Sequence, residues 1–267
     1  MNDHIVKIVV WGLVSWSITF LVIRRILLPN RSFGFCNRVV STIHAALAVI
    51  LASLSVEDWS CPVCPLASQS SPSQVHNCLF KMSFGSCNKE KRLICVCLCF
   101  TEQMKAIAVS LSYLIYDLIC SLFDKQAGLD NTIHHLVSIV GSVAGLTYKR
   151  CGSEMAAALW MTEISSPFLH AREILKELGY KDTDLNFAAD MSFAVIFSTA
   201  RMVGGPFLTY VTLRAANPFI IKAMALGLQL VSAFWFYKIA RMAMYKLRRR
   251  STFKKAPSYY PNSEKQN

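Results

Sequence analysis

Long apolar blocks, separated by short basic connections, dominate the sequence. A bilayer has a hydrocarbon core of about 30 Å, which a helix of roughly 17–25 residues crosses. Because backbone polar groups find no water in that core, helices are the expected form. The blocks therefore predict an all-α, multi-span transmembrane helical bundle of about seven helices. The predicted spans are residues 5–28, 38–56, 105–123, 132–148, 153–170, 187–213 and 218–244.

Composition supports an integral membrane protein and argues against a nucleic-acid partner. Of the 267 residues, 54% are hydrophobic and 16% are charged, whereas a soluble domain carries about a quarter charged residues. The basic residues, which give a net charge of +12, lie between the apolar blocks and in the C-terminal tail. There they set topology and meet anionic headgroups. Their distribution predicts a luminal N-terminus and a cytosolic C-terminus.

Two segments lie outside this pattern. Residues 57–104 are predicted to form an irregular, cysteine-rich loop. Two alternatives stay open for residues 75–103: an insertion absent from the working form, such as translated unspliced sequence, or a disulfide-bearing luminal loop. Cys61 and Cys64 have the spacing of zinc ligands but lack a second clean pair, so no metal is predicted, and no cofactor either. Residues 246–267 are predicted to be a basic disordered tail.

The fourth predicted span opens on a histidine pair, His134 and His135. Small residues Ser138, Ser142 and Gly145 share a helical face with His134, which permits close helix approach or leaves room for a lipid chain. A neutral imidazole there could act as a general base, or as a nucleophile toward an acyl thioester. The alternative is that both histidines hydrogen-bond neighbouring helices and hold the bundle together.

The fifth predicted span carries Glu163, Ser166 and His170 on one face, at spacings of three and four residues. Ionisable groups inside a span usually face a cavity or a partner. Pro167 removes a backbone donor and should kink this helix, freeing a carbonyl toward a cavity. Glu163 could orient a histidine, or it could pair structurally with Arg201.

Three further polar residues are candidates for the same cavity. Asp117 in the third span could be the acidic partner of a histidine across the bundle, or a buried structural carboxylate. Arg201 in the sixth span could hold a phosphate or carboxylate headgroup, or neutralise Asp117 or Glu163. His44 is a lone histidine in an apolar helix, for which packing is the default. The aromatic run 234–237 is typical of an interfacial anchor.

Four stretches, taken together, resemble the TLC (TRAM, LAG1 and CLN8) domain family, and within it the small plant TLC proteins related to the TLC domain-containing protein 4 group. The resemblance implies a lipid-related protein of the endoplasmic reticulum or secretory pathway. It also implies a barrel-like domain of six helices after one N-terminal helix. The chain then divides into residues 1–36, the TLC domain 37–245 and the tail 246–267. The stretches are 37–44 (NRVVSTIH), 112–118 (SYLIYDL), 134–135 (HH) and 163–168 (EISSPF).

The sequence departs from the ceramide synthases of that family. Those enzymes follow the His-His pair with a His-Asp pair and a further Asp in the next span. Here the matching region, residues 162–170, reads TEISSPFLH, with one His, one Glu and no His-Asp pair. The departure weakens the expectation of acyltransferase chemistry.

Two functional hypotheses follow. In the first, the protein binds membrane lipids or fatty acyl chains and serves lipid homeostasis through sensing, trafficking or control of membrane composition. The alternative is an acyl-CoA-dependent acyltransferase of the ceramide-synthase type that uses His134 or His135. Whether the protein is an enzyme, and whether it forms a homodimer, stays open. A retinal pigment is not favoured, because Lys222 and Lys238 lie toward the ends of the last span.

Overall fold

The computed structural model describes residues 3–55, 89–123, 128–148 and 152–255, with the side chains of 89–100, 249 and 251–255 left aside. Within these ranges every regular element is helical, which confirms the prediction of an all-α bundle. The elements are α1 (Asp3–Val22), the π-helical η1 (Ile23–Leu27), α2 (Phe33–Leu54), α4 (Lys89–Phe123), α5 (Leu129–Tyr148), α6 (Gly152–Glu163), α7 (Ser166–Glu177), α8 (Asp184–Phe197), the π-helical η3 (Ser198–Gly204), α9 (Gly205–Arg214) and α10 (Phe219–Lys255).

The described helices include segments long and apolar enough to cross a bilayer, which confirms a multi-span protein. By length and composition these are Asp3–Leu27, Phe33–Leu54, Thr101–Phe123, Asp184–Arg214 and Phe219–Arg248. The fourth predicted span is helix α5. The fifth is two shorter helices, α6 and α7, and does not form one continuous helix.

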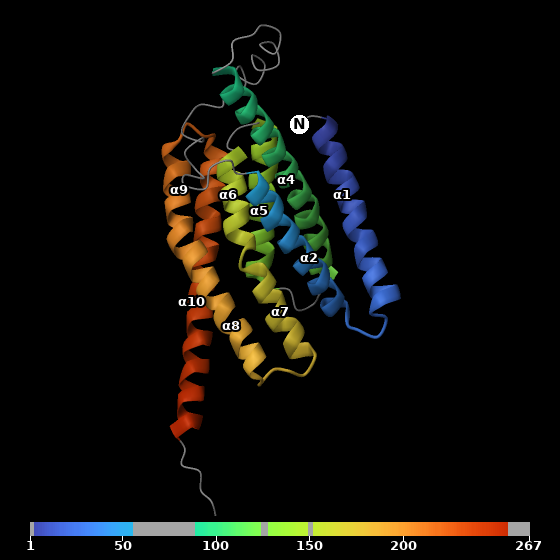
Figure 1. The fold of residues 1–267 in the computed structure, drawn as a ribbon, viewed down its shortest axis with the longest axis vertical. Coiled ribbons are helices and arrows are strands. Elements are labelled where there is room, and N and C mark those ends of the chain that lie inside the picture. Colours follow the sequence, from blue (N-terminus) through green and yellow to red (C-terminus); the bar gives the residue numbers. More distant parts are fainter. Residues whose placement is uncertain (1–2, 56–88, 124–127, 149–151, 256–267) are drawn as a thin grey trace, which may run out of the picture.

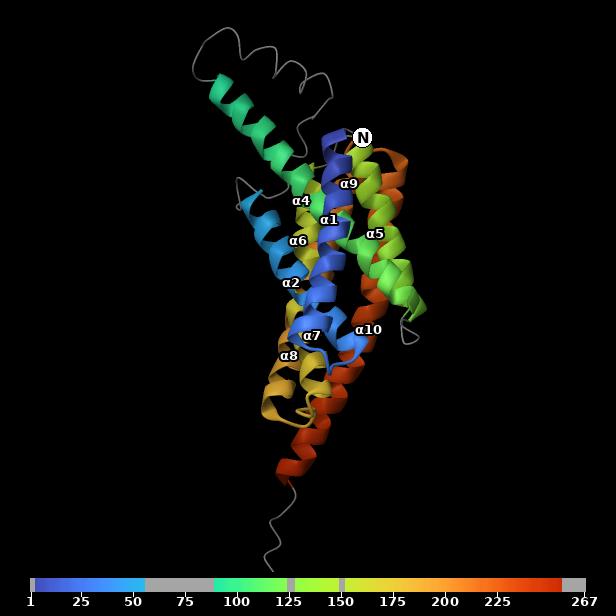
Figure 2. The same ribbon diagram turned by 90° about the vertical axis from the view of Figure 1, so that its right-hand side faces the viewer.

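The helices pack side by side into an elongated bundle (Figures 1 and 2). Contacts between neighbours close a ring that runs α2, α4, α5, α10, α8–α9, α6–α7 and back to α2. Helix α1 lies outside this ring and packs mainly against α4. The buried aromatic side chains of Trp16, Phe20 and Tyr113 form the core of that contact. The ring encloses the space in which the polar side chains of the spans meet.

The break between α6 and α7 has a local cause. Pro167 stands in the first turn of α7, where its missing N–H costs nothing to that helix. The same missing N–H would have bonded the carbonyl of Glu163, so the helix ends there. The predicted kink is thus a break across Ile164 and Ser165. Near Gly205, by contrast, the chain stays helical and passes from η3 directly into α9.

Two predicted irregular segments are partly helical. Helix α4 begins at Lys89, so residues 89–104 of the predicted loop 57–104 extend the third span. Lengthening an existing helix needs no new nucleation, and Lys, Glu, Arg, Leu and Gln are good helix formers. The remainder of the loop, with Cys61 and Cys64, lies outside the described residues, and the two alternatives for 75–103 stay predictions.

The predicted disordered tail also begins later than expected, because α10 continues to Lys255. Lys246 and Arg250 of this extension form ion pairs with Asp190 and Asp184 of α8. Tertiary ion pairs thus supplement the helix propensity of the basic residues. Residues 256–267 lie outside the described part of the chain. In both figures the end of α10 projects beyond the rest of the bundle.

Candidate functional site: two adjoining cavities

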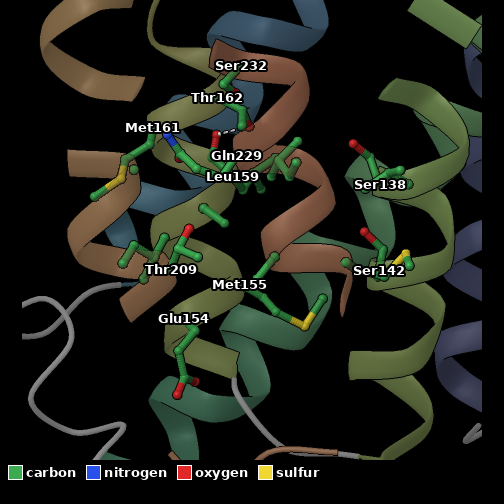
Figure 3. Close-up of a pocket in the computed structure, with 18 of the residues that line it drawn as sticks. Ser138, Ser142, Glu154, Met155, Leu159, Met161, Thr162, Thr209, Gln229 and Ser232 are labelled. Carbon is green, nitrogen blue, oxygen red and sulfur yellow. Dashed lines mark hydrogen bonds between the residues drawn. The ribbon is translucent and has the colours of Figure 1, made fainter. Parts of the chain in front are cut away.

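Two adjoining cavities of opposite character lie inside the ring. The first, of about 150 Å³, lies among α5, α6, α9 and α10 and is lined mostly by apolar side chains such as Met155, Leu159 and Leu228. Ser138 and Ser142 of α5 line the wall of this cavity opposite α6 (Figure 3). The second cavity, of about 270 Å³, is lined by most of the ionisable residues of the spans. Both cavities share His44, Leu114, His134, Glu163 and Arg201 as wall residues.

The polar cavity is built around a contact between His135 and Asp117. His135 Nε2 lies 3.1 Å from Asp117 Oδ2, and both side chains are largely buried. The other carboxylate oxygen accepts a hydrogen bond of 2.8 Å from Asn37 Nδ2. Tyr116 OH in turn donates to Asn37 Oδ1 at 2.9 Å. Asp117 therefore contacts a histidine across the bundle, and Asn37 and Tyr116 fix its orientation.

His134 faces both cavities from the neighbouring position on α5. Its ring lies 4.8 Å from the ring of Trp235, and its Nδ1 is buried with no hydrogen-bond partner. Trp235 is held in place because its Nε1 donates to Asp130 Oδ2 at 2.7 Å, where Lys238 Nζ also donates at 3.0 Å. Asp130 lies outside the predicted span 132–148. Burial raises its pKa, but the two hydrogen bonds and the charge of Lys238 hold the pKa of this carboxyl group below its ordinary value.

Arg201 is a buried cation at the boundary between the cavities, with 5% of its surface exposed. Its Nη2 donates to the carbonyl of Thr162 at 2.8 Å and its Nη1 to Ser232 Oγ at 3.3 Å. The guanidinium also lies over the rings of Phe197 (5.1 Å) and Trp235 (5.8 Å). Its Nε has no partner. Arg201 belongs to η3, and π-helical turns are frequent at functional sites.

Glu163 does not form the direct ion pair with Arg201 that one interpretation predicted. Among the described residues, no nitrogen of Arg201 lies within 4 Å of a carboxylate oxygen. The nearby Ser166 Oγ donates to the carbonyl of Thr162 at 3.4 Å. His170, one turn further on α7, lines the polar cavity as well. Glu163 and Arg201 thus face the same space without neutralising each other by contact.

The ring of His44 is held by aromatic packing. Its ring stacks on Tyr113 with centroids 3.7 Å apart and an interplanar angle of 8°. Trp16 of α1 meets both rings edge-on at 5.6 Å. The His44 ring nitrogens are buried without partners, and the side chain also borders both cavities.

The structure adds residues that the sequence did not indicate. Glu154 on α6 is 3% exposed, lines the apolar cavity and keeps one carboxylate oxygen without a partner. It lies at the opposite end of α6 from Glu163, about 14 Å along the helix axis. Trp235 belongs to the run 234–237 that was interpreted as an interfacial anchor, yet it lines the polar cavity. Only the three-dimensional contact between α5 and α10 reveals this role.

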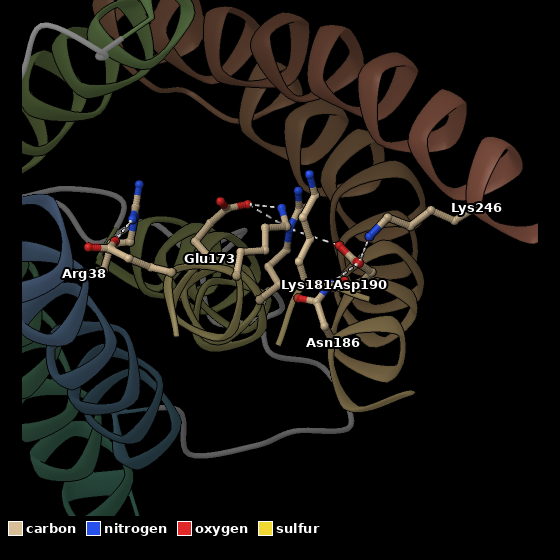
Figure 4. A network of polar contacts seen from close by, with 9 residues as sticks. Arg38, Glu173, Lys181, Asn186, Asp190 and Lys246 are labelled. Atoms are coloured by element: carbon tan, nitrogen blue, oxygen red, sulfur yellow. Dashed lines mark hydrogen bonds and ion pairs between the residues drawn. The ribbon is translucent and has the colours of Figure 1, made fainter. Parts of the chain in front are cut away.

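A buried ionic cluster borders one side of the polar cavity (Figure 4). Asp190 is fully buried and forms ion pairs with Arg172, at 3.2 Å, and with Lys246. Asn186 Nδ2 donates to Asp190 Oδ2 at 3.2 Å. Because Arg172 also lines the cavity, the cluster joins α7, α8 and α10 directly beside the site. In the described residues no group of three or more His, Cys, Asp or Glu is placed to hold a metal ion.

Comparison with protein families decides the classification. The TLC domain (TRAM, LAG1 and CLN8) matches residues 34–241, which is most of the chain. The protein belongs to the TLC-domain family. This match supports a membrane role related to lipids in general terms. No solved structure matches the chain.

The TLC match coincides with the helix ring. It begins within the first turn of α2 and ends within α10, so it covers the ring and leaves out α1. All the residues that line the two cavities lie inside the matched region. The cavities are therefore a feature of the TLC domain itself, and α1 supports their wall by packing Trp16 against His44 and Tyr113.

Proposed function

We propose that this TLC-domain protein binds a membrane lipid, with the headgroup in the polar cavity and a hydrocarbon chain in the apolar cavity. The observation that carries the proposal is the pair of adjoining cavities that share His134, Glu163 and Arg201 as wall residues. Together they fall within the size of small-molecule sites, about 300–1,000 Å³. An apolar wall next to a few convergent polar groups is what an amphiphile requires.

Headgroup contacts must supply most of the selectivity of such a site. A lipid chain that leaves the bilayer for the cavity exchanges one hydrocarbon environment for another, so its transfer contributes little free energy. In contrast, the unpartnered nitrogens of His134, His135 and Arg201 would gain hydrogen bonds on binding. A buried polar group without a partner costs about 1–3 kcal/mol. The lipid that restores these bonds is the one the site selects.

The cellular role that fits this proposal is lipid homeostasis through sensing, trafficking or control of membrane composition. The resemblance to the plant proteins related to the TLC domain-containing protein 4 group supports a membrane of the endoplasmic reticulum or secretory pathway. The distribution of Lys and Arg supports a cytosolic C-terminus.

Mass spectrometry of lipids that stay bound to the purified protein tests this function. Wild type should retain a defined lipid, and Ser142→Leu, which fills the apolar cavity from α5, should lose it. Thr147→Leu is the matched control, because Thr147 is exposed on the same helix. Retention of the same lipid by Ser142→Leu, or its loss from both variants, would refute a chain in this cavity.

The contact between His135 and Asp117 favours a second function, acyl transfer. An aspartate that orients an imidazole is a recurring device of covalent and general-base catalysis. In this scheme a nitrogen of His134 or His135 attacks the thioester carbonyl of a fatty acyl-CoA, and coenzyme A leaves as its thiolate. The acyl group then passes from the histidine to an amine or hydroxyl.

Intact-protein mass spectrometry after incubation with long-chain acyl-CoA separates the two functions. An acyl adduct on His134 or His135 that an added long-chain amine discharges would establish acyl transfer. Bound lipid without an adduct would support the binding function alone.

A further inference from the structure

We propose that the polar cavity takes an anionic headgroup, a carboxylate or a phosphate monoester, with Arg201 as its charged partner. The inference rests on the proposed lipid-binding function and specifies its ligand class. It starts from the imbalance between donors and acceptors in the cavity wall.

Every buried side-chain atom that lines the polar cavity without a hydrogen-bond partner, within the described residues, is a nitrogen. They belong to His44, His134, His135 and Arg201; Arg172 Nε is ion-paired, 3.1 Å from Glu173 Oε1 and 3.2 Å from Asp190 Oδ1. His135 Nδ1 is an acceptor when His135 Nε2–H donates to Asp117, whereas the Nε–H of Arg201 lacks an acceptor. Among these nitrogens Arg201 Nε–H can only donate, and each neutral imidazole carries one donor. A ligand that supplies several acceptor oxygens, as carboxylates and phosphates do, would satisfy such a wall.

Arg201 differs from the other cations of the cavity in its partners. Arg172 forms ion pairs with Asp190 and Glu173, and Lys238 forms one with Asp130. Within the described residues, the hydrogen bonds of the Arg201 side chain go to neutral oxygens alone, those of Thr162 and Ser232. Its position in the wall of both cavities puts it where the headgroup of a lipid in the apolar cavity would lie. A guanidinium also matches carboxylate and phosphate geometry.

Two further features of the cavities restrict the class of ligand that would fit. The apolar cavity of about 150 Å³ has the size that holds one small apolar group, so it would take part of one hydrocarbon chain, which favours a single-chain lipid. Glu163 borders the same space, and its carboxyl group, when ionised, would repel an anion. Arg201 and Glu163 should therefore have opposite effects on the affinity for an anionic ligand. The proposal thus predicts the sign of the change in affinity for a substitution at each residue.

The experiment measures the affinity of purified protein in nanodiscs of neutral lipid for four ligands with the same chain. These are palmitic acid, hexadecyl phosphate, hexadecylamine and hexadecanol. Wild type should bind the acid or the phosphate at least about tenfold more tightly than the alcohol, as expected for one charge-assisted contact. The preferred anion identifies carboxylate or phosphate as the natural group.

Variants at the two charged residues then assign the effect. Arg201→Gln should lose affinity for the preferred anion by about tenfold more than for hexadecanol, and Arg201→Lys should recover part of that loss. Glu163→Gln should bind the anion as tightly as wild type or more tightly. The inference fails if hexadecylamine binds best, or if Arg201→Gln weakens the acid, phosphate and alcohol equally.

The failure of this inference and that of the proposed function are distinguishable. Equal affinities for all four ligands would refute the preference for an anionic headgroup but would agree with the proposed lipid binding. Absence of binding for every ligand would overturn both.

Discussion

The contact between Asp117 and His135 should be a strongly coupled polar pair. Asp117→Ala removes the acceptor of two donors, the buried His135 Nε2 at 3.1 Å and the half-buried Asn37 Nδ2 at 2.8 Å. Each orphaned donor costs about 1–3 kcal/mol. The two orphaned donors together cost about 2–6 kcal/mol. We expect Asp117→Ala to lower the free energy of unfolding by about that amount.

Unfolding in micelles, driven by a denaturing detergent, measures this loss. A double-mutant cycle with Asp117→Ala and His135→Ala should give a coupling energy of about 1–3 kcal/mol. Glu102→Ala is the matched control, because Glu102 lies on the same helix in an exposed ion pair with Lys105. That control should cost less than about 1 kcal/mol. A coupling below about 0.5 kcal/mol would refute the assignment of Asp117 as the partner of His135.

Three further substitutions test other parts of the structure by the same unfolding assay. Asp190→Ala should destabilise by about 3–5 kcal/mol by leaving Arg172 and Lys246 without their carboxylate; normal stability would show that the cluster does not fix α10. Glu154→Met should stabilise by about 1–3 kcal/mol, because it removes a buried carboxylate oxygen without a partner; a loss of stability would contradict this. Gly12→Val should cost about 1–3 kcal/mol, since a Cβ at Gly12 would lie 2.3 Å from the buried Ser112 Oγ; an unchanged value would mean that α1 is not packed on α4 as described.

The sequence predicted the parts of the fold that depend on local composition. Apolar blocks of membrane length are helices in the structure because the bilayer permits little else. Pro167 predicted the interruption of the fifth span, since a missing N–H acts wherever the residue stands. The suggestion that Asp117 meets a histidine also had a local basis, because a carboxylate inside a span needs a partner.

The rest of the site depends on contacts between helices distant in sequence. Nothing around Trp235 indicates that Asp130 will hold its indole at the cavity, because the two residues meet only when α5 packs on α10. Glu154 is the second residue of the predicted fifth span. A solvated glutamate at the membrane surface would occupy the same position, so the sequence does not distinguish the two roles. The helical extension of α10 beyond residue 246 likewise depends on Asp190 and Asp184 of α8. Periodicity and residue type carry no signal for such pairings.

Photochemical cross-linking with a lipid tests most directly whether a lipid occupies the two cavities. A fatty acid with a diazirine near its chain end would be irradiated with the protein in nanodiscs, and the labelled peptides identified by mass spectrometry. The account predicts labels on Met155, Leu159 or Leu228, which line the apolar cavity, and their loss in Ser142→Leu. Labels confined to exposed residues such as Leu136 and Leu230, unchanged by Ser142→Leu, would contradict it.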